Sequence, residues 1–341
     1  MKKLMAIGLV AALCATAGLA QPGQRLGREC RQAVMQLCGR AGDRQAIRAC
    51  LVKERAKLPD DCRQKLVSIG RERMGGGKAM ATRGGTELAY GSDPKQKLDF
   101  WPAKQAIAPL LVFVHGGGWA IGDKGNDRSD KAGFYTSRGY AYASLNYRLV
   151  PNARPGDQAA DIANAIGWLR KDAARLGFDP DRIILMGHSA GAHLAALVSS
   201  DPRFLANAGV PMTAIRGTVL LDGAGYDVPA QMAFKGNRVS AIYDAAFGAD
   251  PAYQTAMSPI NHASAPNVAN WLLLHVASRP DSAAQSGDLG KALTGAGAKA
   301  DVVAVPDSSH MSVNRDAGIA DSFVARQIEA FLAKALEGGA K

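Results

Sequence analysis

A serine stands between two glycines inside an apolar stretch of the sequence, ILMGHSAGAH (residues 184–193). The glycines flank Ser189 at the spacing of a nucleophile elbow, in which a buried strand ends in a tight turn and a helix begins at once. The neighbouring residues fit, because RIILM (182–186) favours a buried strand and AHLAALVSS (192–200) favours a helix. Ser189 is therefore predicted to be the nucleophile of a hydrolytic site.

A serine hydroxyl is a poor nucleophile without a base, an orienting acid and donors for the oxyanion. Donors are predicted in LLVFVHGGGWAIGDK (110–124), where a buried strand runs into three consecutive glycines. Glycines allow backbone N–H groups to approach a ligand closely. We expect the donors to be the N–H groups of Gly117 and Gly118, joined by that of Ala190, which follows the nucleophile.

With these two motifs, the chain resembles α/β-hydrolases of the esterase and lipase type, close to the hormone-sensitive-lipase-like and feruloyl-esterase-like branch. The matching stretches, in the family's order and spacing, are HGGGWAIGDK, SLNYRLVP, GHSAG and SSHMSVNRD. The resemblance covers about residues 80–341. It implies the α/β class, with a mostly parallel central sheet and helices on both faces.

The catalytic base is predicted among six histidines. Four of these belong to the glycine loop, the elbow, the helix after it or a strand end: His115, His188, His193 and His275. His262 is expected to cap or pack the segment above the site. His310 lies in the polar loop PDSSHMS after the strand DVVAV, where the family's catalytic histidine falls, and is predicted to be the base.

The acid follows the serine and precedes the histidine in this fold. The family usually carries it in the loop after the penultimate strand, and Asp281 is therefore the predicted acid. Relatives place this residue slightly earlier, near Ser278 and Arg279, so the loop is expected to be longer or bulged. Asp222, after the strand GTVLLD, is the alternative that some lipases use. Asp307 is expected to be a turn residue.

Strands and helices alternate through residues 86–341, which predicts a parallel sheet covered on both faces. TELAYGS and KLDFWPA are predicted to form an antiparallel strand pair at its edge. The remaining predicted strands are 110–115, 140–146, 182–186, 216–221, 270–276 and 301–305, and the predicted helices are 157–176, 192–200, 282–296 and 317–335. Residues 224–268 lack a strand pattern and are expected to form the rim or lid of an acyl pocket.

The chain opens with two lysines, an apolar run and small residues, which is typical of a Sec-type signal peptide over residues 1–20. A cysteine-rich helical module is predicted over 21–73, a Gly-rich linker over 74–85 and the hydrolase domain over 86–341. Four cysteines remain after the signal: Cys30, Cys38, Cys50 and Cys62. An even number in an exported chain predicts two disulfides, whose pairing stays open among three possibilities.

Positive charge concentrates near the N-terminus. Residues 21–78 carry 14 Lys or Arg against 6 Asp or Glu, whereas residues 79–341 carry 25 against 24. The module is therefore a candidate for contact with an anionic surface, although a solvated helical surface explains the same charge. A nucleic-acid partner is not expected for an exported protein, and no stretch after the signal is long and apolar enough to span a membrane.

These observations predict a secreted or periplasmic serine hydrolase that cleaves small-molecule carboxylic esters through a Ser189–His310–Asp281 triad and an acyl-enzyme. No cofactor or metal is expected. One alternative is an amidase of the arylformamidase type on the same machinery. Another is a non-catalytic binding protein on a hydrolase scaffold. The acyl-chain length and the natural substrate are not determined by the sequence.

Overall fold

The computed structural model describes residues 28–38, 54, 57–59, 62, 85–125, 129–234, 240–264 and 266–337. The chain divides into two compact units, Met1–Lys78 and Ala79–Lys341. The predicted signal segment 1–20 and residues 74–84 of the predicted linker lie outside the described residues, as does Cys50.

In the first unit, residues Arg28–Cys38 form helix α1, which agrees with the helical character predicted for this part of the module. A disulfide joins Cys30 to Cys62, and Cys38 is also disulfide-bonded. Leu58 packs against the Cys30–Cys62 pair, and all three side chains are buried. The bridge therefore lies inside a small apolar cluster and joins residues that are 32 positions apart.

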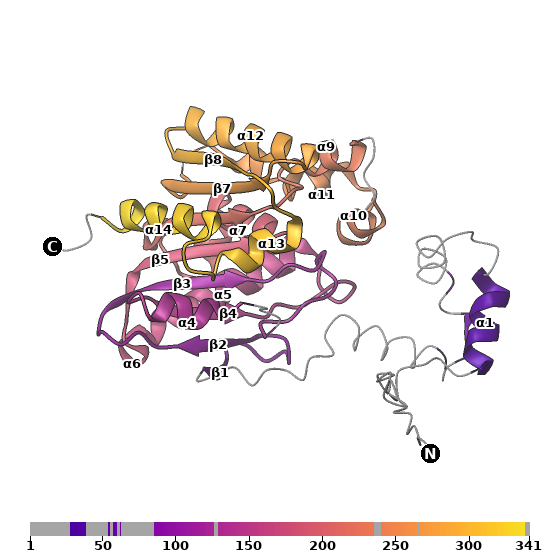
Figure 1. Cartoon of the computed structure of the whole chain (residues 1–341), viewed down its shortest axis with the longest axis horizontal. Coiled ribbons are helices and arrows are strands. Elements are labelled where there is room, and N and C mark those ends of the chain that lie inside the picture. The colour runs from indigo at the N-terminus through magenta and orange to yellow at the C-terminus, as the bar shows by residue number, and fades with distance from the viewer. Residues whose placement is uncertain are drawn as a thin grey trace, which may run out of the picture. The chain divides into compact units, whose positions relative to one another are not determined.

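The second unit is built on an eight-stranded sheet in the order β1-β2-β4-β3-β5-β6-β7-β8 (Figure 1). The strands are β1 (Thr86–Ala89), β2 (Lys97–Trp101), β3 (Ala108–Val114), β4 (Ala141–Leu145), β5 (Phe178–His188), β6 (Ile215–Leu221), β7 (Asn270–Val276) and β8 (Lys299–Val305). The β1–β2 and β2–β4 pairs are antiparallel and all the others are parallel. This confirms the predicted antiparallel edge and the mostly parallel sheet.

Helices cover both faces of the sheet. The apolar cluster on one face includes side chains of α5 (Pro155–Lys171), α7 (Ala190–Ser200) and α12 (Pro280–Gly295). The cluster on the other face includes those of α4 (Lys131–Thr136) and α14 (Phe323–Leu336). Strands β3 and β4 are buried along their whole length because both faces are covered.

Several helix boundaries differ from those predicted. The predicted helix 157–176 is divided at Asp172 into α5 and α6 (Ala173–Leu176). The predicted helix 317–335 begins later as α14, after the separate short helix α13 (His310–Asp316). Helix α8 (Pro202–Asn207) and the 3-10 turn η2 (Met212–Ala214) connect α7 to β6.

The segment between β6 and β7 contains no strand among its described residues, as predicted. It forms α9 (Val228–Ala233), α10 (Ser240–Phe247), α11 (Pro251–Ala256) and the 3-10 turn η3 (Pro259–His262). Arg154 ties this segment to α5, because its guanidinium stacks on the Tyr253 ring at 3.5 Å and donates to the Phe247 carbonyl at 2.8 Å.

In the part of the chain that the structure describes, no helix combines the length and apolar character needed to cross a membrane.

Strand β5 and helix α7 approach each other and β3 so closely that side chains would not fit between them. A Cβ on Gly187 would overlap the carbonyl oxygen of Gly191, and a Cβ on Gly191 would overlap the carbonyl oxygens of Val114 and His115. These obstacles are backbone atoms, which cannot rotate away as a side chain could. The two glycines therefore allow the turn between them to lie against the end of β3.

We expect Gly191→Ala to lower the free energy of unfolding by at least about 2 kcal/mol, because overpacking at fixed backbone forces strands and helices apart. Urea unfolding followed by circular dichroism measures the change. The matched control is Gly287→Ala in α12, where no described atom lies within 4 Å of the Cβ position. This variant should be neutral or gain up to about 1 kcal/mol. Equal stability of the Gly191 variant and the wild type would contradict the packing argument.

Candidate active site

Ser189 lies in the turn between β5 and α7, as the elbow motif predicts. Its backbone has φ 57° and ψ −121°, a conformation that costs energy for a residue with a Cβ and that persists only where surrounding structure enforces it. The Ser189 N–H donates to the Leu221 carbonyl at 3.0 Å, which fixes the turn to the end of β6. The strain therefore lies at the residue predicted to do chemistry.

His310 is the first residue of α13, directly after the loop that follows β8. Its Nε2 lies 2.9 Å from Ser189 Oγ, and its Nδ1 lies 2.7 Å from Asp222 Oδ2. The ring is also held through its backbone, because His188 Nε2 lies 2.8 Å from the His310 carbonyl oxygen. The structure thus brings the predicted nucleophile and base together, with Asp222 on the far side of the imidazole.

The expectation that Asp281 contacts the imidazole is wrong. Three residues separate β7 from α12, and Asp281 falls in the first turn of α12. Its Oδ2 accepts from Arg279 Nη2 at 3.0 Å and from Gln231 Nε2 at 3.4 Å. Asp222, the alternative directly after β6, takes the place at His310 instead.

The Asp222 carboxylate is fully buried and is held at the ends of two strands. Its N–H donates to the Leu274 carbonyl at 2.7 Å, and its Oδ1 accepts from the Val276 N–H at 2.9 Å. Burial alone would raise the pKa of Asp222, but hydrogen bonds from His310 and Val276 and the charge of Arg279 outweigh burial and hold this pKa well below its usual range. Asp222 is therefore an anion that can only accept hydrogen bonds.

The glycine loop lies against Ser189. A Cβ on Gly116 would be 3.0 Å from the Cβ of Ser189, and Gly117 and Gly118 have φ values of 120° and 58°. Within the loop, the N–H groups of Ala120 and Ile121 donate to the Gly117 carbonyl. Among the described residues, no protein group accepts from the N–H groups of Gly117 and Gly118, so both are available to a ligand oxygen.

Trp119 anchors this loop in the core. Its indole Nε1 donates to His193 Nδ1 at 3.2 Å, and its carbonyl accepts from Val150 N–H at 3.0 Å and from Gln158 Nε2 at 2.8 Å. The His193 Nε2 donates in turn to the Met257 carbonyl at 2.8 Å. The loop conformation is therefore fixed from α5 and α7 and from the residue that follows α11.

Tyr147, within the SLNYRLVP stretch, supports the start of the same loop. Its hydroxyl donates to the His115 carbonyl at 2.8 Å, and the His115 ring stacks on it with centroids 4.5 Å apart. Sequence reasoning used this stretch only as part of the family resemblance. The role of Tyr147 in holding the loop could not be predicted from the sequence, because it depends on a contact with a residue 32 positions away.

The other histidines occupy the structural places expected of them. His262 Nε2 donates to the Ala256 carbonyl at 2.9 Å, which confirms that it packs the segment above the site.

Sequence reasoning missed Arg279, whose guanidinium contacts Asp222, Asp281 and the His310 ring. Its signal was visible in the sequence, since an arginine stands where relatives carry the acid.

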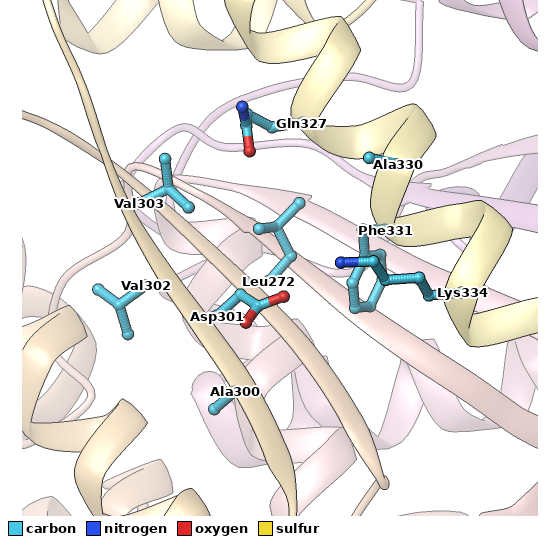
Figure 2. Close-up of a pocket in the computed structure, with 9 residues that line it drawn as sticks. All are labelled: Leu272, Ala300, Asp301, Val302, Val303, Gln327, Ala330, Phe331 and Lys334. Atoms are coloured by element: carbon cyan, nitrogen blue, oxygen red, sulfur yellow. The ribbon is translucent and has the colours of Figure 1, made fainter.

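A concave region away from these residues lies between β7, β8 and α14 (Figure 2). It has a volume of about 250 Å³, and Phe331 and Lys334 of α14 face Asp301 of β8 across it. None of the residues brought together around Ser189 lines it. The candidate active site is therefore the one at the carboxyl ends of β5 and β6, where Ser189, His310 and Asp222 meet.

Comparison with known proteins agrees with this geometry. Residues 98–285 match the BD-FAE family. The chain is 35% identical over 125 residues to the esterase LipC of Mycobacterium tuberculosis, an alignment that covers 35% of this chain and 31% of LipC. It is 36% identical over 112 residues to a probable isoprenylcysteine alpha-carbonyl methylesterase, ICMEL2, of Arabidopsis thaliana, which covers 32% and 26% of the two chains. The matched segments thus span a third or less of these curated relatives.

Solved structures share the fold over a larger part of the chain. The butyrate-bound esterase Est2 of Thermogutta terrifontis superposes with a TM-score of 0.61 at 22% identity, covering 74% of this chain and 95% of that one. Esterase B of Lactobacillus rhamnosis gives a TM-score of 0.64 at 22% identity, covering 84% and 96%.

The sheet order, the elbow at the end of β5 and the histidine after β8 together define an α/β-hydrolase. The match to the BD-FAE family covers more than half of the chain, so this protein belongs to that family of α/β-hydrolase esterases.

Three histidines around the site are buried as neutral rings, which makes stability depend on pH. Burial lowers the pKa of His115 and His193 to about 4 and that of His188 to about 3. In the unfolded chain an imidazole takes up its proton near pH 6.5. The unfolded state therefore binds more protons below that pH, and the free energy of unfolding should fall between about pH 6.5 and 4 by up to about 1.4 kcal/mol per pH unit for each ring.

His193→Gln should flatten this pH dependence, because glutamine can hold the bonds to Trp119 and Met257 but cannot take up a proton. Urea unfolding of the wild type and the variant between pH 7 and 4.5 measures both slopes. The two curves should converge as pH falls. Parallel curves would show that His193 takes up its proton at the same pH in the folded and unfolded chains, which would contradict a pKa lowered by burial.

Proposed function

We propose that this protein is a serine carboxylesterase that uses Ser189, His310 and Asp222. The observation that carries the proposal is the hydrogen-bonded series from Ser189 Oγ through His310 to Asp222, with distances of 2.9 and 2.7 Å, beside a glycine loop with available N–H groups. The esterases among the relatives support the choice of ester over other acyl compounds.

In the first step, Ser189 Oγ attacks the ester carbonyl carbon while His310 Nε2 takes the hydroxyl proton. The tetrahedral intermediate then collapses, its bond to the alcohol oxygen breaks, and His310 returns the proton to the leaving alcohol. In the second step, His310 takes a proton from water, which attacks the acyl-enzyme and releases the acid. The proton passes back to Ser189, so the site is regenerated.

Asp222 accepts the hydrogen bond of His310 Nδ1–H throughout this cycle. Because the carboxylate is ionised, it holds the proton on Nδ1 and leaves the Nε2 lone pair for the serine. When Nε2 is protonated, the carboxylate stabilises the positive ring. We assign the oxyanion to the N–H groups of Gly117, Gly118 and Ala190, which requires the positive φ values of the two glycines.

The substrate proposed is a small ester with an apolar group. Exposed apolar side chains come from the segments that carry the site: Ile121 follows the glycine loop, and Met311 follows His310. Ile242 of α10 lies over the loop, since a Cβ on Gly118 would be 2.6 Å from its Cγ2. Est2 of Thermogutta terrifontis has been solved with butyrate and with propionate, which supports a short acyl group for this chain as well.

The triad makes a prediction that separates the two candidate acids. Ser189→Ala should reduce hydrolysis of p-nitrophenyl esters by at least about a thousandfold, and Asp222→Asn should reduce kcat by up to about ten-thousandfold because it favours the wrong imidazole tautomer. Asp281→Asn is the matched control and should cost far less, because its carboxylate contacts Arg279 and Gln231 rather than His310.

A larger loss for Asp281→Asn than for Asp222→Asn would overturn the acid assignment. A wild-type rate for Ser189→Ala would overturn the hydrolase itself and favour a binding protein on this scaffold. Parallel assays on aryl amides distinguish an amidase, which would turn over the amides at least as fast as the esters.

We also propose that the chain is exported to an oxidising compartment. The lysines and apolar run at its start support this, and so does the Cys30–Cys62 bond, since structural disulfides persist outside the reducing cytosol. The contact of the basic segment 21–78 with an anionic surface stays a prediction, because most of this segment lies outside the described residues.

Exported protein isolated without reductant should contain no titratable thiols in denaturant, because all four cysteines after the signal are then paired. A thiol-reactive chromophore measures their number before and after reduction, with about four appearing on reduction. Thiols that react before reduction would contradict the pairing, and a precursor that keeps its first 20 residues in the purified protein would contradict export.

A further inference from the structure

Arg279 stands in the loop between β7 and α12, at the residue that caps the helix. Its Nη1 donates to Asp222 Oδ2 and lies 2.8 Å from His310 Nδ1, while its Nη2 donates to Asp281 Oδ2 at 3.0 Å. The guanidinium is therefore held between two carboxylates, one fully buried and one partly exposed. With a carboxylate on each side, it has a fixed position beside the imidazole.

Only one arrangement of protons suits these contacts. Asp222 is ionised and can only accept, so both His310 Nδ1–H and Arg279 Nη1–H point at its Oδ2. A guanidinium proton cannot be donated to Nδ1 while Nδ1 carries its own proton. Arg279 therefore shares the carboxylate with the imidazole rather than donating to Nδ1, and Asp222 favours the tautomer that leaves Nε2 free for Ser189.

The charges facing His310 differ from those of a site with an isolated carboxylate. Asp222 contributes one negative charge and Arg279 one positive charge. Ser189 is neutral, and the His188 ring, 4.6 Å away between centroids, is also neutral because burial lowers its pKa to about 3. Asp281 acts from behind Arg279. The positive guanidinium thus offsets the carboxylate, and protonation of the imidazole gains less than it would beside Asp222 alone.

We propose that Arg279 is a positioning residue that locks Asp222 in place and offsets the charge of this carboxylate at the His310 imidazole. The proposal rests on the proposed esterase function for its kinetic consequence, but the charge arrangement itself does not depend on any substrate. Arg279 acts through Asp222 and His310 and is not expected to touch the ester.

The kinetic test compares pH profiles of kcat/KM for a p-nitrophenyl ester. Arg279→Gln removes the positive charge, so the acid limb should move about one pH unit upward, which is an approximately tenfold loss of activity below the limb. Arg279→Met is a second neutral variant of similar length and should show the same shift. Arg279→Lys keeps the charge and should restore most of the wild-type profile.

The matched control is Arg170→Gln, which breaks the ion pair of Arg170 with Asp181 at the opposite, amino end of β5. It removes the same charge and should leave the acid limb where it is. An unshifted acid limb in both folded neutral variants, or an equal shift in the Arg170 variant, would overturn the proposal. A shift in the neutral variants that lysine reverses would support it.

A second measurement needs no activity. In Ser189→Ala protein, NMR of the imidazole signals gives the pH at which His310 takes up its proton, and adding Arg279→Gln should raise that pH by about one unit. A midpoint that does not move would overturn the inference even in an active enzyme. If the midpoint moves in this background but the wild-type chain, with Ser189 intact, hydrolyses no ester, the inference is upheld and the proposed function is rejected, so the two failures are distinguishable.

Discussion

The close backbone contact between β3, β5 and α7 is the constraint on which the rest of the site depends. The elbow can hold Ser189 in its strained conformation only because Gly187 and Gly191 let the helix begin against the end of β3. The same contact brings the loop after β3 against the serine, since Gly116 lies next to its side chain. One packing arrangement therefore sets both the nucleophile and the N–H groups beside it.

Around this contact, different layers of the fold position different parts of the site. The sheet supplies the serine and the carboxylate, and side chains beneath and above the glycine loop hold it from several directions. Trp119 is the most connected of these, because it joins the loop to α7 through His193 and packs edge-on against Tyr243 and Phe247 of α10. The rim segment is thus packed directly against the glycine loop through Trp119.

Much of this was predictable because it depends on local patterns. The elbow and the glycine loop each follow a buried strand and each need glycines where backbones approach closely. A helix follows the first and a tryptophan follows the second, so all of these features can be recognised from neighbouring residues in the sequence. The predicted strand 270–276 matches β7 at both ends for the same reason, as its centre, Trp271–Leu274, is a continuous apolar run. His310 could be selected because its loop follows the last strand.

The acid could not be selected in that way. Asp222 and Asp281 both follow strands, and the choice depends on how many residues separate β7 from α12, which is a matter of three-dimensional packing. The helix begins at Pro280, so Asp281 falls in its first turn and Arg279, just before the helix, contacts the imidazole. The break of the long helix at Asp172 and the late start of α14 were missed for a similar reason, since the apolar spacing continues across both boundaries.

The position of the acid directly after β6 has a consequence for how many parts of the site can move independently. Ser189 is bonded through its N–H to Leu221, and Asp222 follows at once and is bonded to Leu274 and Val276 on the next strand. Nucleophile and acid therefore belong to one rigid body, defined by the register of three adjacent strands. The base alone arrives from outside that body, on a seven-residue helix tethered to His188. Assembly of the site therefore depends on the placement of His310 between Ser189 Oγ and Asp222 Oδ2, whose residues the sheet already holds in position.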